Sequence, residues 1–167
     1  LGDVYKRQAD IIGQSGVTAE AEILLLLINA CREMGLTDAE FRIFLNDRRI
    51  LNSILEKIEV PPNLHDSVLV IMDKRDKVSP ESFSEMLVES GMNTSQVEQL
   101  KEYLAIPELE SLSKLLPDCE GITALQELSE LINISGFSSY IKFDLSIVRG
   151  LSYYTGPVFE MKHPQKS

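Results

Sequence analysis

The feature that most restricts the fold is the stretch IKFDLSIVRGLSYYTGPVFE, residues 141–160. Apolar side chains occupy every second position over residues 141–147, which is typical of a half-buried strand. Continued alternation would place Arg149 on the apolar side, where a guanidinium requires a carboxylate or phosphate partner. The alternative is that Gly150 ends the strand and Arg149 reaches water. The pattern alone leaves both readings open.

The residues after the second glycine of this stretch predict a return strand that includes Val158, Phe159 and Met161. Pro157 has no backbone N–H to donate to a ladder. We therefore expect this strand to begin near Pro157 or to lie at an edge of its sheet.

Composition bounds the possible functions. The 167-residue chain is 44% hydrophobic, enough for a domain with a core, and its net charge is 16 − 26 = −10. Such an acidic chain lacks the overall signature of a nucleic-acid-binding surface. Cys31 and Cys119 are far apart and predict buried reduced thiols, with metal binding or catalysis as the minor alternative. His65 and His163 are also isolated, so we expect no metal site.

Strands and helices alternate in the first 59 residues. Apolar spacing and turn residues predict a strand end at residues 9–13, a helix at 20–34, a strand at 41–45 and a helix from 46 to about 58. Thr18 is the expected cap of the first helix, which is apolar nearly all round and is therefore expected to be buried against a sheet. Asn46 and Arg48 are expected to serve as cap and surface charge. The apolar run at 23–28 is too short to span a bilayer, so we expect a cytoplasmic protein with no membrane contact.

Pro61 and Pro62 mark a boundary, and residues 60–118 predict helices only. These are a helix at 64–74, one capped by Ser79, one begun by a capping box of Ser95 with Glu98, and one at 109–116. A last amphipathic helix spans about 122–132. The predicted organisation is an α+β chain with core parts at 1–59 and 119–167 and an all-helical insertion at 60–118.

The sequence VRGLSYYTGPVFE resembles RGLDYYTGTVFE, the signature that the histidyl-tRNA synthetase family carries late in its catalytic domain. The family's strand ending in isoleucine-glycine resembles residues 10–13, and its LNxR-type strand end resembles residues 45–48. The resemblance implies part of the antiparallel-sheet catalytic domain of a class II synthetase with an inserted helical subdomain. Ser152 and Pro157 depart from the family pattern, at positions with no role in the chemistry.

The resemblance also implies the chemistry. The family joins histidine to ATP with Mg²⁺, then passes the histidyl group to tRNA(His), usually as a homodimer. Arg149 matches the arginine at the α-phosphate. Tyr154 and Tyr153 match the tyrosines of the histidine pocket, and Asp10 matches the acid on the other imidazole nitrogen. Gln8 matches the glutamine near the α-amino group, although it sits two residues closer to the following glycine than the family spacing.

The resemblance covers only a middle slice of the family enzyme. The first motif, the arginine arm of the second, the third motif and the anticodon-binding domain have no counterpart, so we expect the chain alone not to charge tRNA. Residues 1–8 resemble translated adaptor sequence, with a divergent strand as the alternative. The insertion carries 5 basic and 11 acidic residues, a net charge of 5 − 11 = −6. This charge favours a packing or interaction module over a subdomain that binds tRNA strongly.

Two other functions remain open. A non-catalytic relative, the regulatory subunit of ATP phosphoribosyltransferase, keeps the fold but typically loses the full signature that this chain retains. A helical interaction protein with an acidic surface would explain residues 60–135 but not the cluster at 149–156.

Overall fold

The computed structural model describes residues 8–14, 16–148 and 155–164. The helices are α1 (Thr18–Glu33), α2 (Arg48–Lys57), α3 (Pro62–Met72), α4 (Pro80–Glu89), α5 (Thr94–Leu104), α6 (Leu109–Leu115) and α7 (Glu120–Ile134), with short 3₁₀ turns at Arg75–Lys77 and Ser138–Tyr140. The strands are β1 (Arg42–Asp47), β2 (Ile141–Phe143) and β3 (Pro157–Lys162). This mixture of helices and one small sheet is the predicted α+β class.

The three described strands form one sheet in the order β2-β1-β3. β1 runs parallel to β2, with Ile43 opposite Ile141, and antiparallel to β3, with Phe44 opposite Glu160. The expected return strand is confirmed as β3. It begins at Pro157 and lies at the edge of the described sheet, as a residue without an N–H requires.

The strand predicted over residues 141–147 is too long, because β2 ends at Phe143. The Asp144 N–H donates to the Leu45 carbonyl at 2.9 Å, and the chain then turns. The Asp144 carboxylate accepts from the Ser146 N–H at 2.9 Å, while the Ile147 N–H donates to the Asp144 carbonyl at 3.2 Å. Aspartate favours such turns by bonding its own backbone two residues on. The alternation therefore ends before Arg149 and says nothing about its side.

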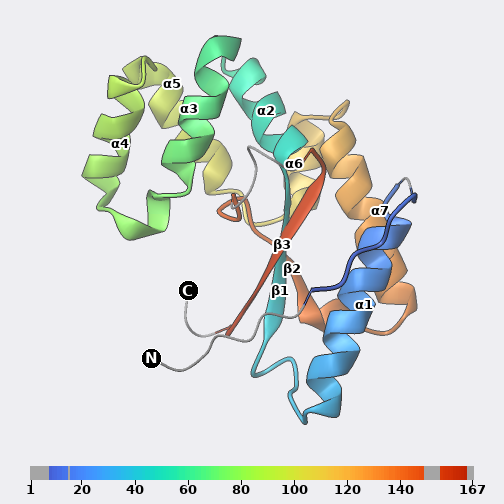
Figure 1. Ribbon diagram of the computed structural model, residues 1–167. Coiled ribbons are helices and arrows are strands. Elements are labelled where there is room, and N and C mark those ends of the chain that lie inside the picture. The colour runs from blue at the N-terminus through green and yellow to red at the C-terminus, as the bar shows by residue number, and fades with distance from the viewer. Residues whose placement is uncertain (1–7, 15, 149–154, 165–167) are drawn as a thin grey trace.

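The main core lies where α1 and α7 pack side by side and α7 contacts β1 and β3 (Figure 1). Leu24 and Ile28 of α1, Ile43 of β1 and Leu128 of α7 are all fully buried there. The prediction that α1 is apolar nearly all round and buried was only partly right. Leu26 is 56% exposed because the helix is covered on one side only.

The predicted helix caps are partly wrong. Val17, not Thr18, is the N-cap of α1, and it makes no side-chain cap bond. Ser79 caps α4 as predicted, with Pro80 as the first helical residue. The capping box of α5 is Asn93 with Gln96, since Ser95 already lies inside the helix.

Helices α3, α4 and α5 form a lobe that stands apart from α1 and α7 (Figure 1). The Gln96 side chain fixes this helical lobe to the end of α2 by donating to the carbonyl of Glu59 at 2.8 Å. Arg48 at the start of α2 pairs with Asp66 of α3 at 2.6 Å. Together with the packing of α2 against α3 and α5, these two contacts join the helical lobe to the rest of the protein.

Residues 9–13 were expected to end a strand, but they form no strand in the structure and are all exposed. Ile12 is 92% exposed. A strand exists only where a neighbouring strand completes its hydrogen bonds, and none of the described strands pairs with this segment. Cys31 and Cys119 are free and buried, which confirms the predicted thiols.

Candidate functional site

Three of the predicted site residues, Arg149, Tyr153 and Tyr154, lie outside the described residues. Their flanks are described, and both lie at the carboxyl end of β1. On one side, the Ile147 carbonyl accepts a hydrogen bond from Asn46. On the other side, Pro157 is paired with Asp47. Both flanks of the signature therefore lie at this end of the sheet.

The other two predicted residues, Gln8 and Asp10, are exposed and contact each other. The Gln8 Nε2 donates to both carboxylate oxygens of Asp10, at 3.1 and 3.0 Å. Within the part of the chain that is described, neither side chain has another hydrogen bond. The structure thus brings these two residues together but does not join them to the carboxyl end of β1.

The last two residues of β1, Asn46 and Asp47, are the buried polar side chains of the described core, both 0% exposed. The Asn46 Nδ2 donates to the carbonyls of Leu145 at 3.2 Å and Ile147 at 2.9 Å. Its Oδ1 accepts from the Asp47 N–H at 2.8 Å. The expectation that Asn46 caps a helix was wrong, because Asp47 is the N-cap of α2 and the Asn46 NH2 group binds the segment that leads into the signature.

Asp47 is the cap of α2 and accepts from the Arg49 N–H at 2.9 Å. Its carboxylate also receives Arg49 Nε at 3.0 Å and Nη2 at 2.7 Å, a two-point ion pair. The hydrogen bond to Asp47 is the main cause that raises the pKa of Arg49 above its usual value. Arg49 also lies 3.7 Å from Glu120 at the start of α7.

Gly121 allows α7 to approach this ion pair. A Cβ built on Gly121 would lie 2.9 Å from the Asp47 Oδ1 and 3.0 Å from the Ile50 Cγ1. Distances below 3.0 Å are closer than real Cβ contacts, so any larger residue would displace the pair or the helix. Glycine is needed here for space, not for an unusual backbone angle.

A cavity of about 460 Å³ adjoins this junction. The first turn of α1 contributes Glu20, and α7 contributes Glu120 and Glu127. Arg49 and the last two residues of the signature, Thr155 and Gly156, also line it. One carboxylate oxygen of Glu20, Oε2, is buried without a hydrogen-bond partner. With three carboxylates against one guanidinium, the cavity suits a cationic group better than an anion.

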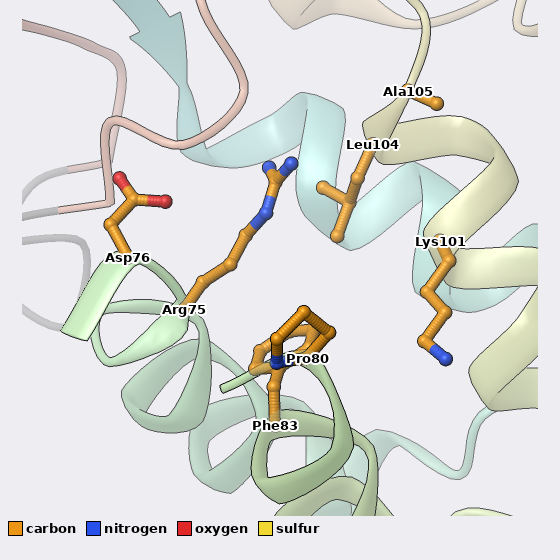
Figure 2. Close-up of a pocket in the computed structure, with 7 residues that line it drawn as sticks. All are labelled: Arg75, Asp76, Pro80, Phe83, Lys101, Leu104 and Ala105. Carbon is orange, nitrogen blue, oxygen red and sulfur yellow. The ribbon is translucent and has the colours of Figure 1, made fainter. Parts of the chain in front are cut away.

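A second hollow runs between the helical lobe and the sheet. It consists of two adjoining cavities of about 390 and 440 Å³, which share Arg75, Asp76, Leu104 and Ala105. Figure 2 shows Phe83 and Pro80 on one wall of the first cavity and Lys101 on the other, with the Arg75 guanidinium extending toward Leu104. The second cavity adds Phe44, Lys142, Lys162 and His163, and also Asp144. Across both cavities, four Lys and Arg side chains (Arg75, Lys101, Lys142 and Lys162) face two aspartates, Asp76 and Asp144. Basic side chains therefore gather in this basic groove although the chain as a whole is acidic.

The described residues contain no cluster of three or more His, Cys, Asp and Glu side chains that could hold a metal ion. None of the described helices is both long and apolar enough to cross a membrane.

A small mixed sheet, a helical lobe and the two flanks of the signature at the carboxyl end of β1 match the fold expected for part of a class II synthetase catalytic domain. The comparisons with known proteins give the particular family. The family model described as histidyl-tRNA synthetase matches residues 5–167, and the chain belongs to that family.

Curated relatives agree with this assignment. The chain is 35% identical over 157 residues to the chloroplastic/mitochondrial histidine–tRNA ligase of Arabidopsis thaliana, covering 93% of the chain and 32% of the relative. It is 32% identical to the histidine–tRNA ligase of Haloarcula marismortui, covering 95% of the chain and 37% of the relative. The chain therefore spans about a third of the length of these relatives.

Solved structures support the fold. Histidyl-tRNA synthetase from Nostoc sp. PCC 7120 superposes with a TM-score of 0.78 at 22% identity, over 89% of this chain and 37% of that one. A Bacillus halodurans protein described as an ATP phosphoribosyltransferase regulatory subunit/histidyl-tRNA synthetase superposes with a TM-score of 0.74 at 23% identity, over 92% of this chain and 41% of that one.

Sequence reasoning missed the roles of Asn46, Asp47 and Gly121. A polar pair directly before a helix indicated a cap, and Asp47 does cap α2. The long-range contacts of Asn46 join residues 99 and 101 positions apart, and no local pattern specifies such a pairing. Gly121 gave no signal, since one glycine near a helix start is unremarkable in sequence.

Proposed function

We propose that this chain is the central part of a histidine–tRNA ligase, which activates histidine with ATP and transfers the histidyl group to tRNA(His). The observation that carries the proposal is the retained signature RGLSYYTG at 149–156, in a chain that belongs to this family. Its flanks are held at the carboxyl end of β1, where the Asn46 side chain and the Asp47–Pro157 pairing fix the chain on either side.

The proposed roles follow the resemblance. Arg149 stabilises the negative charge that develops on the α-phosphate as the histidine carboxylate attacks it. Tyr154 and Asp10 meet opposite nitrogens of the histidine ring, and Tyr153 lines the same pocket. A hydroxyl and a carboxylate at fixed positions select an imidazole over apolar rings of similar size. Gln8 is assigned to the substrate α-amino group.

ATP enters as its Mg²⁺ complex in this proposal, because members of the family use that substrate. Mg²⁺ is usually held by one or two carboxylates together with substrate phosphates, so a site made by protein groups alone is not required. Homodimer formation is proposed from the resemblance as well. Location in the cytoplasm stays a prediction, and the Arabidopsis relative is named chloroplastic/mitochondrial.

The basic groove supports tRNA as a partner. Arg75, Lys142 and Lys162 line it at the junction of the helical lobe and the sheet. Clustered cations favour the phosphate backbone of a nucleic acid, even where the net charge of the region is negative.

The assay that tests the proposal is histidine-dependent exchange of pyrophosphate into ATP by the complete polypeptide that contains this sequence. We expect exchange with the wild type, a large loss with Arg149→Ala, and no exchange by the 167-residue chain alone. Absence of exchange by a folded complete polypeptide would exclude the ligase. Robust exchange by the 167-residue chain would contradict the expectation that other parts of the enzyme are required.

The second candidate is the regulatory subunit of ATP phosphoribosyltransferase, favoured by the description of the Bacillus halodurans structure. It predicts histidine binding to the complete polypeptide without exchange and without coupling to ATP. Calorimetry with histidine and with a histidyl-adenylate analogue separates the two candidates. Tight binding of the analogue that Arg149→Ala abolishes is the ligase result.

A further inference from the structure

We propose that Asn46 is a positioning residue for the signature arginine: its buried side-chain amide holds the chain that leads into Arg149 in one conformation. This inference rests on the proposed ligase function. Asn46 touches no predicted substrate group, so its effect on the reaction must pass through the residues that it holds.

The contacts of Asn46 are with main-chain atoms of the lead-in segment, residues 144–148. Its Nδ2 donates to two carbonyls of this segment, those of Leu145 and Ile147, at 3.2 and 2.9 Å. Ile147 precedes Arg149 by two residues. Asn46 is 0% exposed, so these bonds form away from competing water and an unpaired carbonyl there would be costly.

Hydrogen bonds and buried side chains fix the backbone conformation of the lead-in segment along its length. Its first N–H, that of Asp144, bonds to the Leu45 carbonyl of β1. The Asp144 side chain and carbonyl then bind the N–H groups of Ser146 and Ile147. Leu145, Ile147 and Val148 bury their side chains in the core. Asn46 supplies the two bonds that this local turn cannot make for itself.

Asn46 is itself fixed from the opposite side. Its Oδ1 accepts from the N–H of Asp47, and Asp47 caps α2 and pairs with Arg49. Helix α7 closes over the Asp47 carboxylate at Gly121. The amide oxygen is thus bound by the Asp47 backbone, and Asp47 is in turn held by its contacts with α2 and packed against α7.

Only an amide of this length satisfies the whole set. An asparagine side chain provides two N–H donors and a carbonyl acceptor, and all three are in use here. Aspartate would present a carboxylate to two carbonyls and stand next to the carboxylate of Asp47. Alanine would leave both carbonyls without their donor, and serine could replace only one of the two donors.

A double-mutant cycle on the complete polypeptide tests the proposal. The pyrophosphate-exchange rate is measured for the wild type, Asn46→Ala, Arg149→Ala and the double variant. Misplacement by about 1 Å can cost on the order of 100-fold in rate, so we expect Asn46→Ala to lower kcat by roughly 10- to 100-fold with little change in KM. In the Arg149→Ala background we expect the same change to cost less than about threefold, because the group being positioned is gone.

The matched control is Asn52→Ala. Asn52 lies in α2 and is partly buried, and its Oδ1 has no partner. Asn52→Ala removes a side-chain amide from α2, but it leaves the carbonyls of the lead-in segment bonded to Asn46. We expect Asn52→Ala to leave kcat within about twofold of the wild type.

Equal losses from Asn46→Ala in both backgrounds would overturn the proposal, since Asn46 would then act independently of Arg149. If Asn46→Ala does not fold, Asn46→Ser enters the same cycle with one donor kept, and the same criterion applies. An inactive wild type would instead refute the ligase function. The two failures are therefore distinguishable.

Discussion

Gly121→Ala is the sharpest test of the packing at the carboxyl end of β1. A Cβ at this position would meet the Asp47 Oδ1 at 2.9 Å, the Ile50 Cγ1 at 3.0 Å and the Arg49 Cβ at 3.1 Å. All three neighbours are held in place. Asp47 and Ile50 are fully buried, and Arg49 is bound to Asp47 through two side-chain contacts.

The magnitude follows from three effects, two that destabilise the protein and one that stabilises it. Extra volume in a well-packed interior costs about 1–3 kcal/mol. Disturbing a hydrogen bond to a charged group costs roughly 1.5–3 kcal/mol more if the Asp47–Arg49 pair moves. Alanine gains up to about 1 kcal/mol over glycine as a helix former, which offsets part of the loss in α7. We expect Gly121→Ala to lower the free energy of unfolding by about 2 kcal/mol.

The measurement is urea unfolding followed by circular dichroism. With a slope of about 2 kcal/mol per molar urea, the midpoint should fall by roughly 1 M at an unchanged slope. Gly156→Ala is the matched control, because a Cβ there meets nothing within 4 Å. Its midpoint should stay close to that of the wild type. In the Asp47→Ala background, Gly121→Ala should cost less, since the nearest obstacle is gone.

A midpoint for Gly121→Ala equal to or above that of the wild type would refute the reasoning. It would mean that α7 moves away from Asp47 at no cost. Equal losses at Gly121 with and without the Asp47 carboxylate would show that the clash lies elsewhere.

Three further predictions concern caps, titration and the basic groove. Asn93→Ala should destabilise the protein by about 1 kcal/mol in urea unfolding, whereas Ser95→Ala should change little. Hydrogen bonds from the Thr37 side chain and N–H lower the pKa of Glu40, so Thr37→Val should raise that pKa in an NMR titration. In the complete polypeptide, Arg75→Ala should weaken tRNA binding and reduce the slope of log K against log salt by about 0.7–0.9.

Each of these has its own contrary result. A greater loss for Ser95→Ala than for Asn93→Ala would reassign the capping box. Because the pKa of Glu40 is lowered in the folded state, its contribution to stability is present above the ordinary carboxyl pKa and is lost as the pH falls. A contribution of Glu40 to stability that is lost as the pH rises, instead of as it falls, would contradict this prediction. Lys74, exposed and outside the groove, is the control for Arg75, and equal salt slopes for Lys74→Ala and Arg75→Ala would remove the groove from the tRNA footprint.

Local patterns predicted the local structure well. A serine cap before a helix depends on one side-chain acceptor, and a proline at an edge strand depends on one missing donor. Ser79 and Pro157 were therefore assigned correctly from sequence. The family resemblance added the fold, because the signature occurs in a chain whose other segments also match.

The errors share a physical cause. The alternation at 141–147 was real, but the Asp144 side chain offered its neighbours an alternative to the ladder, and the strand ended. Ser95 fitted a capping box as well as Asn93 did, and only the position of the first helical turn distinguishes them. A local sequence is compatible with several sets of hydrogen bonds, and the set that forms depends on tertiary packing.

The carboxyl end of β1 shows why the central part of the candidate site was beyond sequence analysis. Three segments meet here: residues 46–49, the start of α7 at Gly121, and the lead-in segment. More than seventy residues separate the first from the second, and more than twenty separate the second from the third. They meet because β1 lies between β2 and β3, so that its last residues face both flanks of the signature. Asn46 connects two segments. Its Oδ1 accepts from the N–H of Asp47, the cap of α2, and its Nδ2 donates to the lead-in segment before Arg149. Substitutions here should therefore separate catalysis from stability, whereas those at Gly121 should affect stability first.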